Sequence, residues 1–161
     1  MRRFITAALG AALIAGCALG GAPASLGQTH DEVQAHMGTP TGRYRLPEGG
    51  QRLEYAHGPR GRETWMVDMD PSGHVTRVAQ VLQDEYFAQV ADGMPEDALL
   101  RLLGRPADRA GEWQHRETWS WRFHTNDCLW FRVTLSADRK VIHGGAMMPD
   151  PACDAGRIRT P

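Results

Sequence analysis

The chain repeats its own pattern at an offset of 66 residues. Residues 27–40 align with residues 93–106, and both segments end in Gly-x-Pro. At the same offset, large apolar residues fall on one another: Leu53 on Trp119, Tyr55 on Trp121, Trp65 on Phe131, Val67 on Val133, Met69 on Leu135 and Val75 on Val141. Self-similarity at a fixed period indicates that one supersecondary unit was duplicated. Duplicated small α+β units are mostly scaffolds and binding surfaces, so the repeat also constrains the function.

Each copy predicts one helix followed by three strands. Apolar pairs four residues apart mark the helices: Val33 with Met37, and Leu99 with Leu103. Gly38 and Gly104 are expected to end these helices as left-handed caps, since a proline two residues later prevents continuation. The strands are expected at 51–57, 62–69 and 74–80, and at 117–123, 128–135 and 140–145. The predicted fold class is α+β, with two tandem helix-plus-three-stranded antiparallel sheet units at 27–80 and 81–147 and a tail at 148–161.

Alternation of apolar and polar residues predicts that each sheet has one apolar and one polar face. The apolar faces should form the core under the helices, with Trp65, Trp119, Trp121 and Phe131 among their side chains. The polar faces should stay open. An additional helix is expected over 82–90, where apolar residues form one stripe. Because a unit of this size buries too little surface alone, the two units should share an interface.

The first 16 residues have the pattern of a signal peptide. Arg2 and Arg3 precede an apolar run that is too short to span a membrane, and Ile-Ala-Gly-Cys ends it. This ending resembles the bacterial lipobox, in which the cysteine, here Cys17, becomes the lipidated first residue. Residues 17–26 then form a tether, and Ala18 in place of Asp favours the outer membrane. The alternatives are an ordinary secretory signal and an inner-membrane anchor.

Cysteine usage agrees with an oxidising compartment. The chain has three cysteines, and lipidation of Cys17 would leave Cys128 and Cys153 as a pair. A pair in the periplasm is expected to form a disulfide, and closing this loop stabilises the fold by about 3.5 kcal/mol in the chain-entropy estimate. The alternative is two unpaired thiols.

Charge and motifs exclude several classes of function. Loss of Arg2 and Arg3 with the signal peptide changes the formal net charge from −1 to −3, which gives no footprint for nucleic acid or a polybasic membrane patch. The seven histidines and the serines lie in none of the spacings typical of metal sites, phosphate-binding loops or nucleophile elbows. We therefore expect no enzyme, no cofactor, no metal and no small-molecule substrate.

The second unit carries a family resemblance. Gly93-Met94, Leu99 and Leu103-Gly104-x-Pro106, followed by an aromatic strand pair, resemble the SmpA/OmlA domain of BamE-like outer-membrane lipoproteins. The same unit in tandem is similar to β-lactamase inhibitory protein. The resemblance implies an envelope protein partner, with outer-membrane assembly components as candidates, although a BamE-like chain has one unit and this chain has two.

Four residues are candidates for partner binding. If Phe131 points into the core, Trp130 points to the polar face beside Arg132 and Arg122, and Trp and Arg are enriched at binding hot spots. The alternative is that Trp130 fills the contact between the units or packs on the tail. Trp113 is expected either to cap the core or to be exposed. The sequence thus predicts a lipid-anchored, non-catalytic scaffold on the periplasmic face of the outer membrane, or alternatively an inhibitor-like module for a periplasmic or secreted enzyme.

Overall fold

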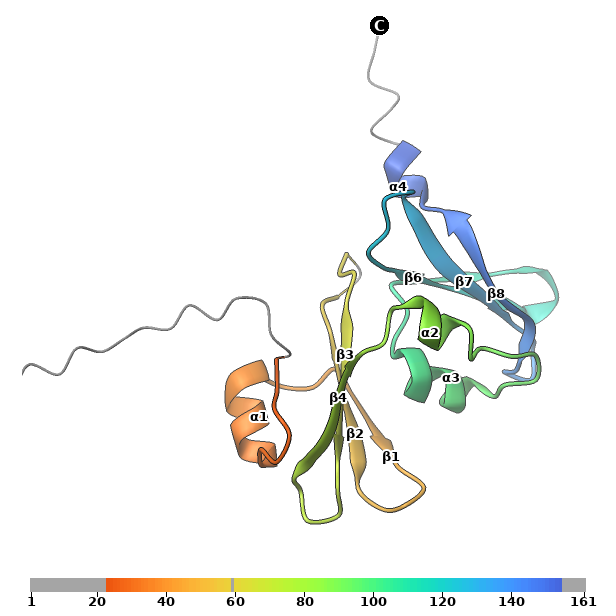
Figure 1. Ribbon diagram of the computed structural model, residues 1–161. Coiled ribbons are helices and arrows are strands. Elements are labelled where there is room, and N and C mark those ends of the chain that lie inside the picture. The colour runs from red at the N-terminus through yellow and green to blue at the C-terminus, as the bar shows by residue number, and fades with distance from the viewer. Residues whose placement is uncertain (1–22, 59, 155–161) are drawn as a thin grey trace, which may run out of the picture.

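The computed structural model describes residues 23–58 and 60–154, and these residues form two four-stranded antiparallel sheets with short helices (Figure 1). Sheet 1 has the order β1-β2-β3-β4 and sheet 2 the order β5-β6-β7-β8, so every strand pairs with its neighbour in sequence. The strands are β1 (Gly42–Arg45), β2 (Gln51–Ala56), β3 (Thr64–Met69), β4 (Val75–Gln80), β5 (Asp108–Gly111), β6 (Glu117–Arg122), β7 (Leu129–Leu135) and β8 (Val141–Pro149). The helices are α1 (His30–Met37), α2 (Asp84–Phe87), α3 (Glu96–Leu103) and α4 (Pro151–Asp154), with a 3-10 turn, η1, at Trp113–His115. The α+β class is confirmed.

The expected three strands per sheet are accompanied by a fourth. β1 and β5 pair with β2 and β6 at the edges of their sheets. Both added strands have only four residues, Gly-Arg-Tyr-Arg and Asp-Arg-Ala-Gly. These sequences show no run of alternating apolar residues, which explains why the sequence pattern did not indicate them. The cleavage, lipidation and most of the tether predicted for residues 1–26 fall on residues 1–22, outside the described part.

The two repeated helices begin and end at the predicted positions. Thr29 and Glu32 form the two reciprocal hydrogen bonds of a capping box at the start of α1. Gly38 and Gly104 follow α1 and α3 with φ of 80° and 76°, but their ψ values of −156° and −169° are extended. The prediction of left-handed caps was therefore wrong in ψ. This region of positive φ and extended ψ is open essentially to glycine alone.

Sheet 1 packs one face against α1. The cluster on this face consists of Ala24, Val33, Leu53, Tyr55, Val67, Met69 and Val75. Sheet 2 packs its apolar face against α2 and α3, and its cluster includes Trp119, Trp121, Phe131, Val133 and Leu135. The helix predicted over 82–90 is only the single turn α2, yet the predicted stripe is buried in this second cluster.

The second face of sheet 1 is covered by the helices of the second unit, contrary to the expectation that it stays open. Met66 of β3 belongs to the core cluster of sheet 2. Arg52 makes a bidentate ion pair with Asp68 through nitrogen–oxygen distances of 2.6 and 2.7 Å, and it also donates to the carbonyl oxygen of Arg101 in α3. The side-chain hydrogen bond with Asp68 raises the pKa of Arg52. In Figure 1 the layers accordingly succeed one another as α1, sheet 1, α2 with α3, and sheet 2.

At Gly104 the backbone of the second unit packs closely against sheet 1. A Cβ atom at this position would lie 2.9 Å from Thr64 Cγ2 and 3.1 Å from both Glu54 Cδ and Met66 Cε. On its other side, the Gly104 carbonyl accepts a hydrogen bond from Trp121 Nε1 at 3.1 Å. Beneath it, the fully buried Glu54 accepts hydrogen bonds from Tyr44 and Thr41. The shared interface predicted for the two units is thus present and contains both apolar and polar contacts.

Candidate partner-binding face

The polar face of sheet 2, called here the outer face, is left uncovered by α1, α2 and α3. Alternation sends Trp119, Trp121 and Phe131 toward the helices, so their strand neighbours point the other way. By register, the outer face carries Thr118, Ser120 and Arg122 of β6, Trp130, Arg132 and Thr134 of β7, and His143, Ala146 and Met148 of β8. The same arrangement was predicted for both sheets, and the structure retains it only in sheet 2.

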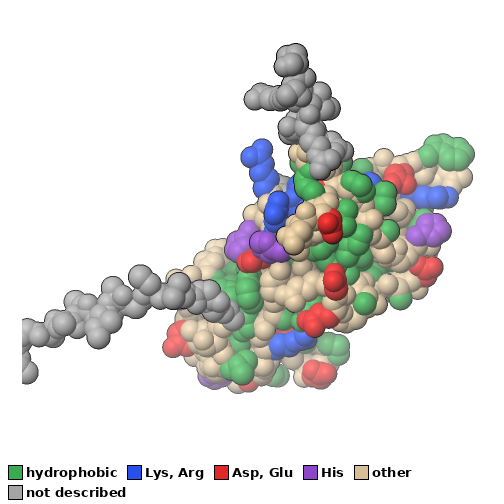
Figure 2. All heavy atoms as spheres, turned by 45° about the horizontal axis from the view of Figure 1, so that its top comes forward, with side chains coloured by type: hydrophobic (Ala, Val, Ile, Leu, Met, Phe, Trp, Pro, Cys, Tyr) green, Lys and Arg blue, Asp and Glu red, His purple; other side chains and the backbone are tan. Residues whose placement is uncertain are grey.

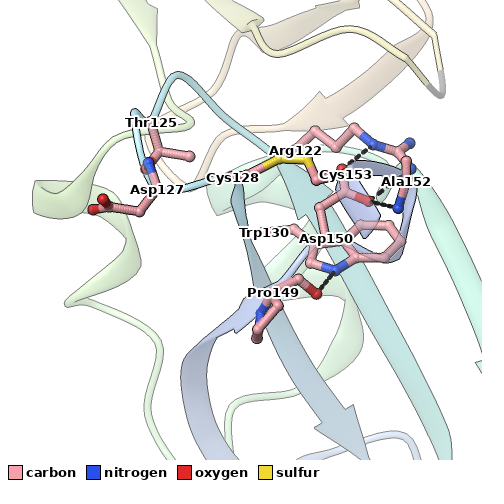
Figure 3. Close-up of a disulfide and its surroundings, with 9 residues drawn as sticks. All are labelled: Arg122, Thr125, Asp127, Cys128, Trp130, Pro149, Asp150, Ala152 and Cys153. Atoms are coloured by element: carbon pink, nitrogen blue, oxygen red, sulfur yellow. Dashed lines mark hydrogen bonds and ion pairs between the residues drawn. A yellow bond between two sulfur atoms is a disulfide. The ribbon is translucent and has the colours of Figure 1, made fainter. Parts of the chain in front are cut away.

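Trp130 lies on the outer face as its register predicts, but it is buried. Its indole Nε1 donates to the Pro149 carbonyl oxygen at 2.9 Å, and the Arg122 guanidinium stands 4.6 Å from the ring centroid (Figure 3). Only 7% of the residue is exposed. The prediction of an exposed hot-spot anchor at Trp130 is therefore wrong. The other alternative, that Trp130 packs on the tail, is found, because the end of β8 pairs with β7 and places Pro149 against the indole. Truncating Trp130 should destabilise the domain.

Arg122 holds the start of the tail. Its Nε donates to Asp150 Oδ2 at 2.8 Å, and Asp150 is 7% exposed. Burial acts to raise the pKa of Asp150, but hydrogen bonds from Arg122 and from the Ala152 amide outweigh it and hold that pKa below its ordinary value. Arg122 thus forms an ion pair within the protein, with Asp150. Only the exposed part of its guanidinium remains for the predicted contact with another protein.

The predicted disulfide is confirmed. Cys128 and Cys153 are joined, with Cα atoms 6.4 Å apart (Figure 3). The Asp150 amide also donates to the Cys128 carbonyl at 2.9 Å, and the Cys153 amide donates to the Asp150 carbonyl at 3.0 Å. These bonds and the disulfide fix α4 at one end of the outer face.

Arg132 lies near the middle of the outer face without a partner among the described residues. Its Nε is buried and has no hydrogen-bond acceptor, and none of the ion pairs formed within residues 23–58 and 60–154 involves it. Arg132 lines a shallow hollow of about 210 Å³ together with Glu112, Thr118, Thr134, His143, Gly144, Ala146 and Met148. A half-buried guanidinium of this kind is suited to donate hydrogen bonds to a carboxylate of another molecule.

Trp113 is exposed, at 85%, in the turn η1 between β5 and β6. The next two residues, Gln114 and His115, have φ of 60° and 57°, a conformation that residues other than glycine seldom adopt. Glu112, just before Trp113, accepts a hydrogen bond from Thr118 and lines the hollow around Arg132. The exposure predicted as one alternative for Trp113 is thus found, at the end of the outer face opposite the disulfide.

Two arginines of the first unit join the other end of the outer face. Arg60 and Arg62, in the connection between β2 and β3, line a cleft of about 630 Å³ with Arg122, Trp130 and Asp150. Figure 2 shows Lys and Arg side chains gathered at the end of the molecule where α4 lies. Sequence reasoning missed Arg60 and Arg62 because the turn that carries them is remote in sequence from β6 and β7. Only the packing of the two units brings them there.

Among the residues that the structure describes, no group of three or more His, Cys, Asp or Glu side chains is close enough to hold a metal ion. A second hollow, of about 370 Å³, lies beside the end of α1 and is lined by His36, His57, Tyr55 and Trp65 among others. The buried Tyr55 hydroxyl nearby has no hydrogen-bond partner in the described part of the chain. No helix within 23–58 or 60–154 is both long and apolar enough to cross a membrane.

Comparison of the chain with protein-family models, with curated proteins and with solved structures finds no match. The resemblance to the SmpA/OmlA domain therefore stays a prediction from the sequence. Lipidation of Cys17 also stays a prediction, because Cys17 lies outside the described residues.

Proposed function

We propose that this protein is a lipid-anchored envelope protein that acts as a non-catalytic scaffold or accessory factor at the periplasmic face of the outer membrane, in the manner of BamE-like lipoproteins. The lipobox-like sequence ending at Cys17 supports the anchor. The disulfide between Cys128 and Cys153 supports an oxidising compartment, since such bonds persist there and are rare in the cytosol.

The observation that carries the proposal is the asymmetry of the two sheets. Sheet 1 is covered on both faces, by α1 and by the second unit, whereas the helices leave one face of sheet 2 uncovered. Arg132 on that face has no side-chain partner among the described residues, and Trp113 is exposed in the turn η1 between β5 and β6. Arginine and tryptophan are the residue types most enriched at binding hot spots. Partner binding is therefore assigned to the outer face, with Arg132 and Trp113 as its principal contacts.

The outer face is also held rigid before a partner arrives. The disulfide fixes one end, and the pairing of β6 with both β5 and β7 fixes its centre. At the opposite end, Arg139 binds both Glu96 of α3 and Glu117 of β6. A pre-organised surface loses less conformational entropy on association, which favours specific binding.

The anchor is tested by Cys17→Ser and fractionation of cells that express each form. The proposal expects the wild-type protein in the outer-membrane fraction after carbonate washing, and the variant released from it. A variant that stays with the washed outer membrane contradicts the lipid anchor.

The scaffold role is tested by affinity capture from solubilised membranes. The proposal expects envelope components, with outer-membrane assembly proteins as the first candidates. It expects Trp113→Ala or Arg132→Ser to weaken capture by about 2 kcal/mol, the hot-spot scale, without loss of folding. Glu85→Ala, at an exposed position on α2, is the control and should leave capture unchanged. Capture of a soluble secreted or periplasmic enzyme, whose activity the protein suppresses, would replace this function by the inhibitor-like one.

A further inference from the structure

The four edge strands of the two sheets differ in how they are protected. β1 carries Arg43 and Arg45, β5 carries Asp108 and Arg109, and β4 carries Arg77 in its middle. β8 has nine residues, Val-Ile-His-Gly-Gly-Ala-Met-Met-Pro, and no Asp, Glu, Lys or Arg. Natural proteins shorten or charge their edge strands to prevent pairing with other chains. β8 is the longest of the four and carries no charged side chain; Pro149 ends it, and its register with β7 is irregular between Arg132 and Leu135.

Only the first part of β8 has a neighbour on its free side. The Gly93 amide donates to the Val141 carbonyl at 2.7 Å, and the Val141 amide donates to the Met94 carbonyl at 2.9 Å. The Val90 carbonyl also approaches Gly144. Residues 145–149 pair with β7 alone within the described part of the chain, and all five are exposed. Pro149 has no amide hydrogen and its carbonyl oxygen already accepts from Trp130, so residues 145–148 offer the backbone groups that a further strand would need.

Small residues leave an open path from this edge to Arg132. Ala146 is the cross-strand partner of Arg132, and Ala146 and Gly144 both line the hollow into which Arg132 projects. A strand added to β8 would lie two strand spacings from β7, roughly 10 Å. Arginine and glutamate side chains together span this distance, and the β8 residue directly between them is Ala146, with His143 and Met148 on either side of the path.

We propose that an extended segment of a partner protein adds to residues 145–148 of β8 as a fifth strand of sheet 2 and places an Asp or Glu carboxylate on Arg132. The inference rests on the proposed function, because it assigns the chemistry of the partner that the outer face receives. The backbone edge supplies affinity independent of sequence, and Arg132 supplies selection for an acidic residue on the outward-facing side of the segment.

Charge distinguishes this occupant from two others. A second copy pairing through its own β8 would bring no carboxylate, because that strand contains none. Residues 155–161 of the same chain carry two arginines and no Asp or Glu, so they offer Arg132 no acidic side chain. An acidic partner segment is the occupant that satisfies the unpaired guanidinium.

The test uses the purified full-length protein, in detergent, to select from a library of random linear ten-residue peptides displayed on phage. The proposal expects enriched peptides with an Asp or Glu at a fixed place in an alternating apolar pattern. Binding of a synthetic enriched peptide should fall at least about tenfold in Arg132→Leu, the scale of one charge-assisted hydrogen bond. Arg45→Leu, the same change on the exposed edge strand β1, should bind the peptide as the wild type does. No enrichment over Arg132→Leu, or enriched peptides without acidic residues, overturns the proposal.

A second variant addresses the edge itself. Ala146→Glu places a carboxylate directly across from Arg132 and should abolish preference for acidic peptides. Hydrogen exchange should show slower exchange of the amides at 145–148 when the peptide binds. Protection confined to β6 and β7, or a concentration-dependent dimer that excludes the peptide, overturns strand addition. If Trp113→Ala abolishes capture of the membrane partner but Ala146→Glu leaves it intact, the proposed function stands and this inference fails.

Discussion

Gly38 and Gly104 occupy equivalent positions in the two repeats, so replacing each by alanine isolates the effect of the interface between the units. Both have φ near 80° and extended ψ, a conformation that costs a residue with a Cβ on the order of 1–3 kcal/mol. At Gly38 the added Cβ meets nothing within 4 Å. At Gly104 it meets Thr64 Cγ2 at 2.9 Å and approaches the buried Glu54 and Met66.

The two substitutions should therefore differ in the free energy of unfolding. The conformational cost is shared, whereas overpacking between the two sheets adds typically about 1–3 kcal/mol at Gly104 alone. We expect Gly104→Ala to destabilise the protein by that additional amount relative to Gly38→Ala. The cost at Gly104 should also disturb Trp121, whose indole donates to the Gly104 carbonyl.

The assay is urea unfolding followed by tryptophan fluorescence, with the dependence on urea checked for equality between the two variants. Equal losses of stability in Gly38→Ala and Gly104→Ala would refute the close packing of the two units at Gly104. A larger loss in Gly38→Ala would contradict it more strongly, because that position has no neighbour to crowd.

Further predictions concern buried pairs, the disulfide and pH. Asp68→Asn breaks the ion pair that the second unit covers and should cost about 3–5 kcal/mol in urea unfolding, whereas Asp97→Asn, in an exposed pair, should have no measurable effect. Replacing both cysteines of the disulfide by serine should lower stability by about 3.5 kcal/mol, and the oxidised protein should be two protons lighter by non-reducing mass spectrometry. The hydrogen bond from Arg139 holds the pKa of Glu96 below its ordinary value of 4.5, so the stability from this pair is present above pH 4.5 and is lost as pH falls through the lowered pKa. The stability difference between wild type and Arg139→Leu should shrink over that acid range in pH-dependent unfolding, and a constant difference would contradict the pairing.

Local signals in the sequence were sufficient for most elements of the fold. The helix ends at Gly38 and Gly104 follow from the absence of a Cβ, and β2, β3, β6 and β7 follow from alternation, which reports one buried face. β8 was expected only to residue 145 and extends to Pro149, because Gly-Gly-Ala-Met-Met has no alternation to detect. The disulfide followed from counting cysteines. β1 and β5 were missed because four-residue strands, Gly-Arg-Tyr-Arg and Asp-Arg-Ala-Gly, leave no alternation to detect.

The candidate site was predicted only in part. The direction of a side chain follows from its place in the strand, but its burial depends on which distant segments pack over it. Alternation placed Trp130 and Arg132 on the outer face correctly. It could not indicate that Pro149 and Arg122 cover Trp130, since this depends on the path of the chain after β8. Burial of the second face of sheet 1 was missed because it depends on how the second unit packs against sheet 1, which local alternation does not report.

Contact of the outer face of sheet 2 with a partner in the envelope can be measured directly. The most direct measurement incorporates a photo-crosslinking amino acid in living cells at Met148, which is 42% exposed on that face, and separately at Glu85, exposed on α2. We expect a discrete crosslinked adduct from position 148 and none from position 85. An adduct from position 85 with none from position 148 would contradict this expectation.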